Sequence, residues 1–198
     1  MAQRQDKKQD KREKKARLSA QDWADAALTA IGEGGLAAVA VEPLAARLGT
    51  TKGSFYWHFT NREALIEAAL ARWAETATEA AITEIDTEPD PASRIRRLFT
   101  EATVSAIDDP LEVSLLATAS HPQVAAALRR VTERRVDYVA GLFADLGFPE
   151  PEARRRGLLA YSVYLGHSQL GHAAPSVLPE GDELGSYLES ALDALMRL

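Results

Sequence analysis

A short stretch in the first third of the chain gathers side chains that suit contact with a polyanion. Residues 52–58 read Lys-Gly-Ser-Phe-Tyr-Trp-His, and Phe55 and Phe59 lie four residues apart. On a helix these two phenylalanines point inward, and a rotation of 100° per residue places Gly53 and Trp57 on the opposite side. Glycine costs about 1 kcal/mol inside a helix, but it lets the backbone approach another surface closely. An exposed face with a cation, hydroxyls and aromatic N–H suits contact with the phosphates and base edges of a DNA groove.

The sequence offers little that points to catalysis or to metal binding. His167 and His172 are five residues apart, which places them about 140° from each other on a helix and favours no shared metal ion. No nucleophile elbow, phosphate-binding loop, dinucleotide-binding fingerprint or EF-hand loop occurs. Ser162 or Ser168 beside a histidine would form a catalytic dyad only by assumption. We therefore predict no enzyme activity, no cofactor and no metal.

Two short helices must position residues 52–58. An apolar stripe with i, i+3, i+4, i+7 spacing runs from Val41 to Leu48, and Gly49 is the expected stop of that helix. Thr50 and Thr51 can cap the next helix with a hydroxyl. We expect this second helix over residues 51–59. Two short helices across a tight glycine turn form a helix-turn-helix, whose second helix enters a major groove.

An earlier helix completes the predicted small domain. Ser19 and Asp22 have the spacing of a capping box, and an apolar stripe begins at Trp23 and ends before Gly34 and Gly35. We expect three helices around one small core, with Trp23 inside it.

Residues 23–70 resemble the N-terminal DNA-binding domain of the TetR family of transcriptional repressors. The resemblance is carried by Ala-Ala-x-x-x-Ile-x-x-x-Gly at residues 26–35 and Leu-Ala-x-x-Leu-Gly at residues 44–49. It continues through Lys-Gly-Ser-Phe-Tyr-Trp-His-Phe at residues 52–59 and Asn-Arg-x-x-Leu at residues 61–65. One position departs from the family pattern, because Ala40 stands where a capping Ser or Thr is usual. This forfeits about 1 kcal/mol of capping.

The resemblance implies an all-α dimer with an N-terminal helix-turn-helix domain and a C-terminal helical domain for ligand binding and dimerisation. Each subunit would place its second short helix in a major groove of a double-stranded operator, with the two copies about 34–36 Å apart. Four residues would hold phosphates, two would approach base edges, and a glycine would allow close contact. The DNA-binding set is Thr51, Lys52, Gly53, Ser54, Tyr56, Trp57, His58 and Arg62, with Lys52, Tyr56, His58 and Arg62 on phosphates and Ser54 and Trp57 near bases.

Charge is distributed unevenly along the chain. The 198 residues have a formal net charge of −6, but residues 1–62 hold 11 basic against 7 acidic side chains. Residues 63–198 hold 12 basic against 22 acidic side chains. A basic end on an acidic body is expected when only that end meets a polyanion.

Three segments follow from these patterns. Residues 1–18 carry eight basic and three acidic residues, and we expect a disordered basic arm because so little of it is apolar. Such an arm can lie on phosphates or in the minor groove, or it can be a solvated tail, and both interpretations stay open. We expect the helix-turn-helix domain over residues 19–62 and the helical effector-binding and dimerisation domain over residues 63–198.

The C-terminal part reads as a series of amphipathic helices. We expect one long helix from Asn61 to about Glu84, which would link the two domains as a lever, and later helices over residues 92–107, 111–119 and 122–147. The arginines at 129, 130, 134 and 135 alternate with acids, which favours a solvated face. The resemblance implies a cavity among these helices for a small-molecule effector that the sequence does not identify. Its candidate lining is Trp73, Phe99, Tyr138, Tyr161 and Ser168, although the same residues could be plain core.

Residues 157–179 contain no Asp, Glu, Lys or Arg. Histidines, glycines and prolines within the segment argue against a membrane span, so we expect a buried helix covered on one side by a second subunit. The last helix, residues 183–197, would complete a homodimer contact. The candidate interface is Tyr164, Gly166, Leu184, Leu188 and Leu192.

The sequence contains no cysteine, and no apolar run of 7–15 residues follows its basic start, so a cytoplasmic location is expected. We interpret the chain as a dimeric TetR-like regulator, by family default a repressor that an effector releases from DNA, with activation left open. The competing hypothesis is a helical small-molecule binder or enzyme in which the N-terminal helices merely pack.

Overall fold

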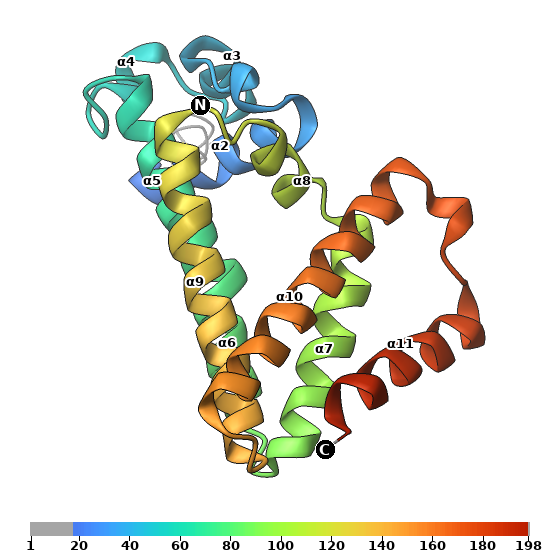
Figure 1. The fold of residues 1–198 in the computed structure, drawn as a ribbon. Helices are drawn as coiled ribbons and strands as arrows, with labels where there is room; N and C mark the ends of the chain where they lie inside the picture. Colours follow the sequence, from blue (N-terminus) through green and yellow to red (C-terminus); the bar gives the residue numbers. More distant parts are fainter. Residues whose placement is uncertain (1–17, 198) are drawn as a thin grey trace, which may run out of the picture.

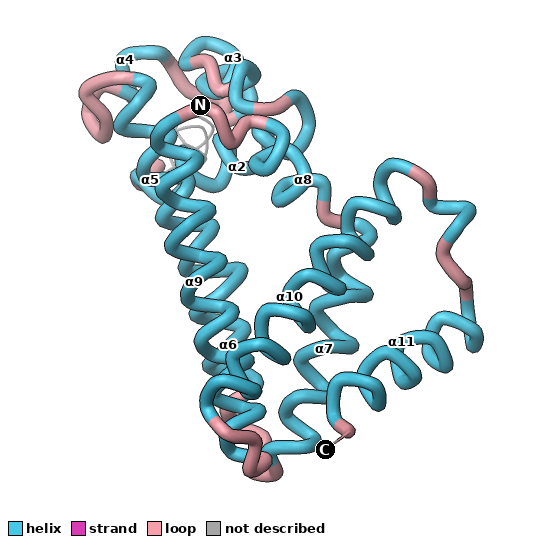
Figure 2. The backbone as a smooth tube through the Cα atoms, viewed as in Figure 1, coloured by secondary structure: helices cyan, strands magenta, loops and turns pink. Residues whose placement is uncertain are grey.

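The computed structural model describes residues 18–197, and this part of the chain contains helices and loops but no strands. Figures 1 and 2 show short helices gathered at one end, from which long helices run toward the other end. The predicted all-α fold is confirmed. The N-terminal elements are α2 (Ala20–Gly34), η1 (Leu36–Ala38), α3 (Val41–Arg47) and α4 (Lys52–Phe55). They are followed by α5 (Arg62–Ala74), η2 (Glu75–Glu79), α6 (Ala80–Ile85), α7 (Pro91–Asp108), α8 (Pro110–Ala117), α9 (Pro122–Asp145), α10 (Glu150–Ala173), η3 (Pro175–Val177) and α11 (Gly181–Met196).

The N-terminal helices share one apolar core. The Ser19 hydroxyl accepts the backbone N–H of Asp22 at 3.2 Å, and the Asp22 carboxylate accepts the Ser19 N–H at 2.6 Å, so the predicted capping box is present. Trp23 and Phe55 are fully buried, and their rings meet edge-on with centroids 5.4 Å apart. Burying one such ring stabilises the fold by about 1.5–3 kcal/mol. Phe55 therefore anchors α4 to α2.

The second helix of the helix-turn-helix is shorter than predicted. Gly49 has φ 61°, the left-handed conformation expected at the end of α3. However, α4 ends at Phe55, and the chain continues in turns in which Phe55 O accepts the N–H groups of His58 and Phe59 at 2.9 and 3.0 Å. Thr51 occupies the N-cap, but its side chain makes no capping hydrogen bond. A glycine and successive aromatic residues favour helix weakly, so tertiary packing rather than propensity holds this segment.

The predicted long helix from Asn61 to Glu84 is continuous but contains a π-helical segment. Asn61 caps this helix by accepting the Ala64 N–H at 2.8 Å, and the helix proceeds as α5 into the π-helical segment η2 and then α6. The sequence pattern did not reveal the π segment. At its start the Thr76 hydroxyl donates to Arg72 O at 2.9 Å, where it competes for a helix carbonyl. Such segments often lie at functional sites, and this one carries the buried Thr78.

The long helices α9 and α10 pack closely together. A Cβ on Gly157 of α10 would lie 2.9 Å from the backbone nitrogen of Ala140 on α9, so only glycine fits there. Below this contact, Phe143 and Phe148 meet edge-on at 5.7 Å and join a second apolar core with α7 and α11.

Helix α8 connects the two ends of the molecule. Its first residues lie against α2, where a Cβ on Gly32 would be 3.5 Å from the Pro110 ring. Ser114 of α8 donates to Gly32 O at 3.5 Å, and Leu115 is buried in the N-terminal core. The same helix turns Glu112 toward the C-terminal helices, where it is buried. One two-turn helix thus contacts both the N-terminal core and the C-terminal helices α9 and α10.

Candidate DNA-reading surface and effector cavity

The predicted DNA-binding residues 51–58, called the reading face below, belong to α4 and the turn after it. They lie at the end of the molecule that α3 and α4 form (Figure 1). Tyr56 and Trp57 are 57% and 78% exposed, whereas Phe55 between α4 and the core is fully buried. Gly53 is exposed, and a Cβ there would meet only the Thr51 hydroxyl at 3.6 Å. The geometry thus leaves room for a side chain at position 53, so glycine is required there only if a partner approaches. Ser54 and His58 are half-buried beside this face.

The basic residues of the folded reading end are engaged within the chain. Lys52 Nζ lies 2.9 Å from the Glu42 carboxylate, and Arg47 pairs with Glu33. Arg62, predicted to meet a phosphate, instead donates to Leu36 O at 2.6 Å and Val39 O at 2.7 Å. The structure therefore gives Arg62 a role in holding the loop between η1 and α3.

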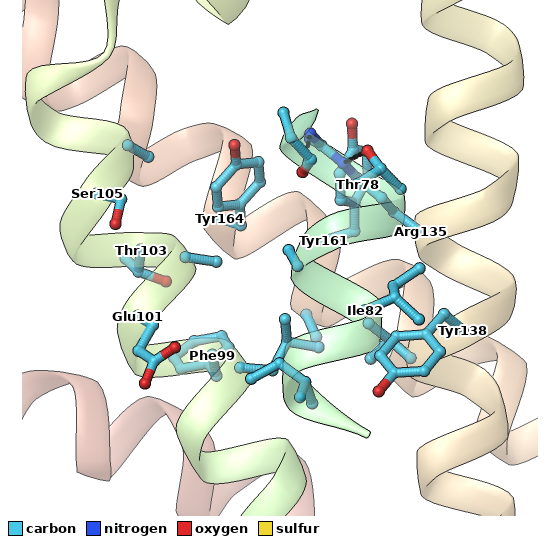
Figure 3. A pocket seen from close by; sticks show the side chains of 18 of the residues that line it. Thr78, Ile82, Phe99, Glu101, Thr103, Ser105, Arg135, Tyr138, Tyr161 and Tyr164 are labelled. Atoms are coloured by element: carbon cyan, nitrogen blue, oxygen red, sulfur yellow. Dashed lines mark hydrogen bonds between the residues drawn. The ribbon is translucent and has the colours of Figure 1, made fainter. Parts of the chain in front are cut away.

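A cavity of about 400 Å³ lies among η2, α6, α7, α9 and α10. Figure 3 shows side chains converging on it from these helices. Four of the five predicted effector residues line it, namely Trp73, Phe99, Tyr138 and Tyr161. The fifth, Ser168, is buried outside the lining and donates to Ala106 O at 3.4 Å. The prediction for Ser168 is therefore wrong, because its position on α10 turns it toward α7 rather than into the cavity.

A buried ion pair forms the polar centre of the cavity. Arg135 Nη1 lies 3.0 and 2.9 Å from the two carboxylate oxygens of Glu112. The hydroxyls of Tyr161 and Tyr164 also donate to this carboxylate, at 3.2 and 2.6 Å. Arg135 uses its other nitrogens on Thr78 Oγ1 at 2.9 Å and on the backbone oxygen of residue 77 at 3.1 Å. Each of the three guanidinium nitrogens of Arg135 therefore has an acceptor, and four of its five N–H groups are used within the chain.

The sequence interpretation of Arg135 as part of a solvated face is wrong. Burial is the largest single influence and opposes its charge, but the Glu112 carboxylate together with Tyr164 and Tyr161 outweighs burial, so the pKa of Arg135 is raised. Burial together with the Glu112 charge raises the pKa of Tyr164. A signal was present in the sequence, because Arg135 lies four residues after Val131 and three before Tyr138 on the apolar stripe of α9. The sequence around Glu112 gave no comparable indication that this side chain is buried.

The rim and far wall of the cavity add further polar groups. Glu84, Glu101 and Asp109 line it, and Arg97 bonds to Glu84 at 2.6 Å and to Glu101 at 2.8 Å. On α7, Thr103 is fully buried and its hydroxyl has no hydrogen-bond partner among the described residues. A buried hydroxyl without a partner costs about 1–3 kcal/mol and indicates a group that a bound molecule can satisfy.

The predicted dimer residues lie in three different environments. Leu188 and Leu192 are each 2% exposed inside the subunit's own second core, so the structure contradicts their place on an outer surface. Tyr164 lines the cavity. Gly166 is exposed on α10, and Leu184 is half-buried against the second core. The outward apolar side chains of α10 and α11 with its preceding loop are instead Leu158, Leu159, Leu170, Val177 and Tyr187.

Within residues 18–197, no group of three or more His, Cys, Asp or Glu side chains is arranged to hold a metal ion. In the same range no helix combines the length and apolar character that crossing a bilayer requires. His167 lies outside the cavity lining, where it stacks on Tyr187 with ring centroids 5.8 Å apart.

The comparisons with known proteins agree with this geometry. Residues 24–69 match the family model described as bacterial regulatory proteins, tetR family. No curated protein matches the sequence significantly. Among solved structures, a transcriptional regulator from Rhodococcus sp. Rha1 has a TM-score of 0.71 and 21% identity, with 90% of this chain and 94% of that chain covered.

Two further solved structures contain ligands. FadR from Bacillus subtilis in complex with stearoyl-CoA has a TM-score of 0.66 at 14% identity, covering 90% of this chain and 98% of that one. A protein from Saccharomonospora viridis in complex with choline has a TM-score of 0.67 at 17% identity, covering 88% and 95%. At these identities the likeness establishes the fold. Residues 24–69 thus match the tetR family model and contain the helix-turn-helix, and the chain has a TetR-like fold with a helical C-terminal domain.

Proposed function

We propose that the chain acts as a homodimeric repressor that binds a double-stranded operator and is released when a small molecule fills the cavity. The observation that carries the proposal is the exposure of Tyr56 and Trp57 directly above the buried Phe55. Large aromatic side chains stay exposed at a large energetic cost unless a partner covers them. Their place in the turn that directly follows the second helix of a helix-turn-helix favours a major groove as that partner.

Within this proposal the reading residues divide by chemistry. Tyr56, Lys52 and His58 meet phosphates, whereas Ser54 and Trp57 approach base edges, with Gly53 permitting the close contact and Thr51 at the start of α4. Lys52 exchanges Glu42 for a phosphate, an exchange that costs little because an exposed ion pair is worth about 0–1 kcal/mol. Arg62 keeps its two carbonyl partners and positions the loop before α3.

The basic arm supplies most of the phosphate affinity in this proposal. Residues 18–62 hold three basic and four acidic side chains, so the folded reading end has a formal charge of −1. Residues 1–17, which lie outside the described residues, hold eight basic and three acidic side chains. Affinity for duplex DNA depends on the number of phosphates neutralised, so the arm is where that charge must come from. This favours the DNA-contacting arm over the solvated tail.

The dimer contact is assigned to the outer face of α10 and α11. Leu158 and Leu159 are both 54% exposed, and Leu170 is 41% exposed on the same charge-poor helix. A Cβ at Gly166 meets nothing within 4 Å, so a partner helix can approach there. Leu184 lies at the edge of this face, and Leu188 and Leu192 support it from inside.

Helix α8 offers the path from effector to DNA. Glu112 of α8 contributes to the cavity, and Ser114 of the same helix bonds to Gly32 of α2. A ligand that shifts Glu112 and its hydrogen-bonded partners, Arg135, Tyr161 and Tyr164, also shifts the contact of α8 with α2. The lever is fixed to the same domain by the ion pair of Arg72 and Asp25 at 3.0 Å. An effector that prefers one position of α8 changes the separation of the two reading helices in a dimer.

The test is fluorescence anisotropy of duplex DNA from upstream of the protein's own gene, titrated with the purified full-length chain across salt. A regulator gives a specific complex that outcompetes random DNA and weakens steeply as salt rises. Absence of binding at every salt concentration would instead support the hypothesis of a small-molecule binder with packed N-terminal helices.

A further inference from the structure

We propose that the cavity accepts a small organic cation, an amine or quaternary ammonium with an apolar or aromatic body. The inference rests on the proposed function in one respect, namely that this cavity is the effector site. It adds the charge and chemical class of the effector, which the fold does not specify.

The first argument is the charge of the lining. Four lining side chains are carboxylates, Glu84, Glu101, Asp109 and Glu112, and one is a guanidinium, Arg135. The adjacent Arg97 offsets one more negative charge through Glu84 and Glu101. The lining therefore keeps a negative formal charge, which comes from the exposed carboxylates Glu84, Glu101 and Asp109 at the rim, where it attracts a cation on its way into the cavity.

The second argument is that Arg135 is not available to a ligand. Its nitrogens are committed to Glu112, Thr78 and a backbone oxygen. A carboxylate or phosphate ligand would have to take Arg135 away from Glu112, which would leave a buried carboxylate without its counter-ion. The site thus disfavours the anionic ligands that a buried arginine would normally attract.

The third argument is the aromatic surface. The Arg135 guanidinium already lies over two of the rings, 5.6 Å from the centre of Trp73 and 5.8 Å from that of Tyr164, so a ligand cation has to use the other rings of the lining. Phe99, Tyr138 and Tyr161 line the remaining space, as Figure 3 shows. The negative faces of such rings attract ammonium groups once these are desolvated.

The unpartnered hydroxyl of Thr103 points to a bound molecule independently of charge. It is fully buried in the α7 wall of the cavity, opposite the Arg135 group in Figure 3. A ligand with a hydroxyl, ether or carbonyl beside its cationic group would satisfy it.

The test is isothermal titration calorimetry of the full-length protein with three probes of similar shape. Benzyltrimethylammonium is the cation, phenylmethanesulfonate the anion and neopentylbenzene the neutral isostere. We expect the cation to bind about tenfold more tightly than the sulfonate, with the neutral probe between them. Equal or tighter binding of the sulfonate would overturn the proposal, as would no saturable binding of the cation up to about 10 mM.

Variants connect the preference to the lining. Glu101→Gln removes a carboxylate of the lining and should reduce the preference for the cation over the sulfonate by about threefold. Glu133→Gln, on the exposed side of α9, is the matched control and should leave the preference unchanged. Glu112→Gln should reverse the preference because it releases Arg135, provided that circular dichroism shows a folded protein. An unchanged preference in Glu101→Gln would contradict the proposal even where Glu112→Gln fails to fold.

Anisotropy with operator DNA separates the two proposals. If the cavity binds the cation selectively but the complex with DNA stays intact, the proposed ligand class is supported and the proposed role of the ligand as effector is rejected. Failure to bind DNA at any salt rejects the regulator, while calorimetry still decides the ligand class.

Discussion

The ion pairs of the N-terminal domain (residues 18–62, the reading end) and of the cavity differ in their exposure to solvent. Lys52 and Glu42 have side chains that are 53% and 74% exposed, whereas Arg135 and Glu112 are 14% and 6% exposed. An exposed pair is screened by salt and contributes about 0–1 kcal/mol, so a phosphate can replace its carboxylate. A buried pair that loses one member costs about 3–5 kcal/mol. The exposed pair can therefore exchange partners, whereas the pair in the cavity stays together.

The two regions also differ in how their residues are brought together. The proposed reading residues of α4 and the turn after it lie within residues 51–58 and are arranged by local helix geometry. Around Arg135, Glu112 is 23 residues away and Thr78 is 57 residues away. A local pattern can be read from a sequence, but a contact between distant helices depends on how those helices pack.

The largest expected effect separates buried from exposed leucines in the C-terminal helices. Leu188→Asp should prevent folding, because losing a buried leucine costs about 2–5 kcal/mol and burying a carboxylate costs more. Leu159→Asp should keep the helical fold but yield monomers, because this side chain faces outward. Circular dichroism and sedimentation velocity check both. A folded monomeric Leu188→Asp would contradict the core position, and a dimeric Leu159→Asp would contradict the assigned face.

The next effect tests the contrast between the ion pairs. Arg135→Leu should lower the free energy of unfolding by about 3–5 kcal/mol because Glu112 is left buried without a counter-ion. The matched change Arg134→Leu removes the exposed pair with Glu79 and should cost about 1 kcal/mol or less. Urea denaturation measures both. The double variant Arg135→Leu, Glu112→Leu should recover most of the loss, and similar losses in the two single variants would remove the contrast.

A third prediction concerns the source of charge at the reading end. Deleting residues 1–17 should weaken operator binding by about 10- to 100-fold at low salt and flatten the salt dependence, because fewer phosphates are neutralised. Anisotropy across salt measures it. A full-length variant with the eight basic residues changed to Gln should behave like the deletion. If the salt dependence of DNA binding is unaltered in both variants, residues 1–17 do not contact DNA and are a solvated tail.

The smallest effect is expected at a single reading residue. Tyr56→Ala should weaken operator binding by about tenfold, the loss of one good contact of about 1–3 kcal/mol. Its melting temperature should stay unchanged, since the side chain is 57% exposed. Tyr56→Phe keeps the ring and removes the hydroxyl, so anisotropy of the two variants separates hydrogen bonding from stacking. Wild-type affinity in Tyr56→Ala would remove this residue from the interface.

Most of the local structure of residues 19–59 could be predicted from the sequence. The Ser19 capping box, the Gly49 turn and the inward Phe55 each depend on neighbours a few residues away, and all three are present. The error there was the length of α4, because the pattern of inward phenylalanines continues through turns that are no longer helical. Most of the helices of the C-terminal part were also predictable, because apolar spacing at 3.6 residues per turn is a local property.

The positions of several side chains on the C-terminal helices could not be predicted from the sequence, because they depend on how distant helices pack. In the structure Leu188 lies in the core rather than on the outer surface, and Ser168 lies outside the cavity. Arg135 points inward, where it pairs with Glu112. A charged residue on a helix is assigned to solvent by default, and only a partner on another helix makes its burial affordable. The π segment η2 likewise has no pattern of its own in the sequence, yet it brings Thr78 to Arg135. The charge of the cavity, and with it the proposed class of ligand, therefore depends on helix packing rather than on any one segment.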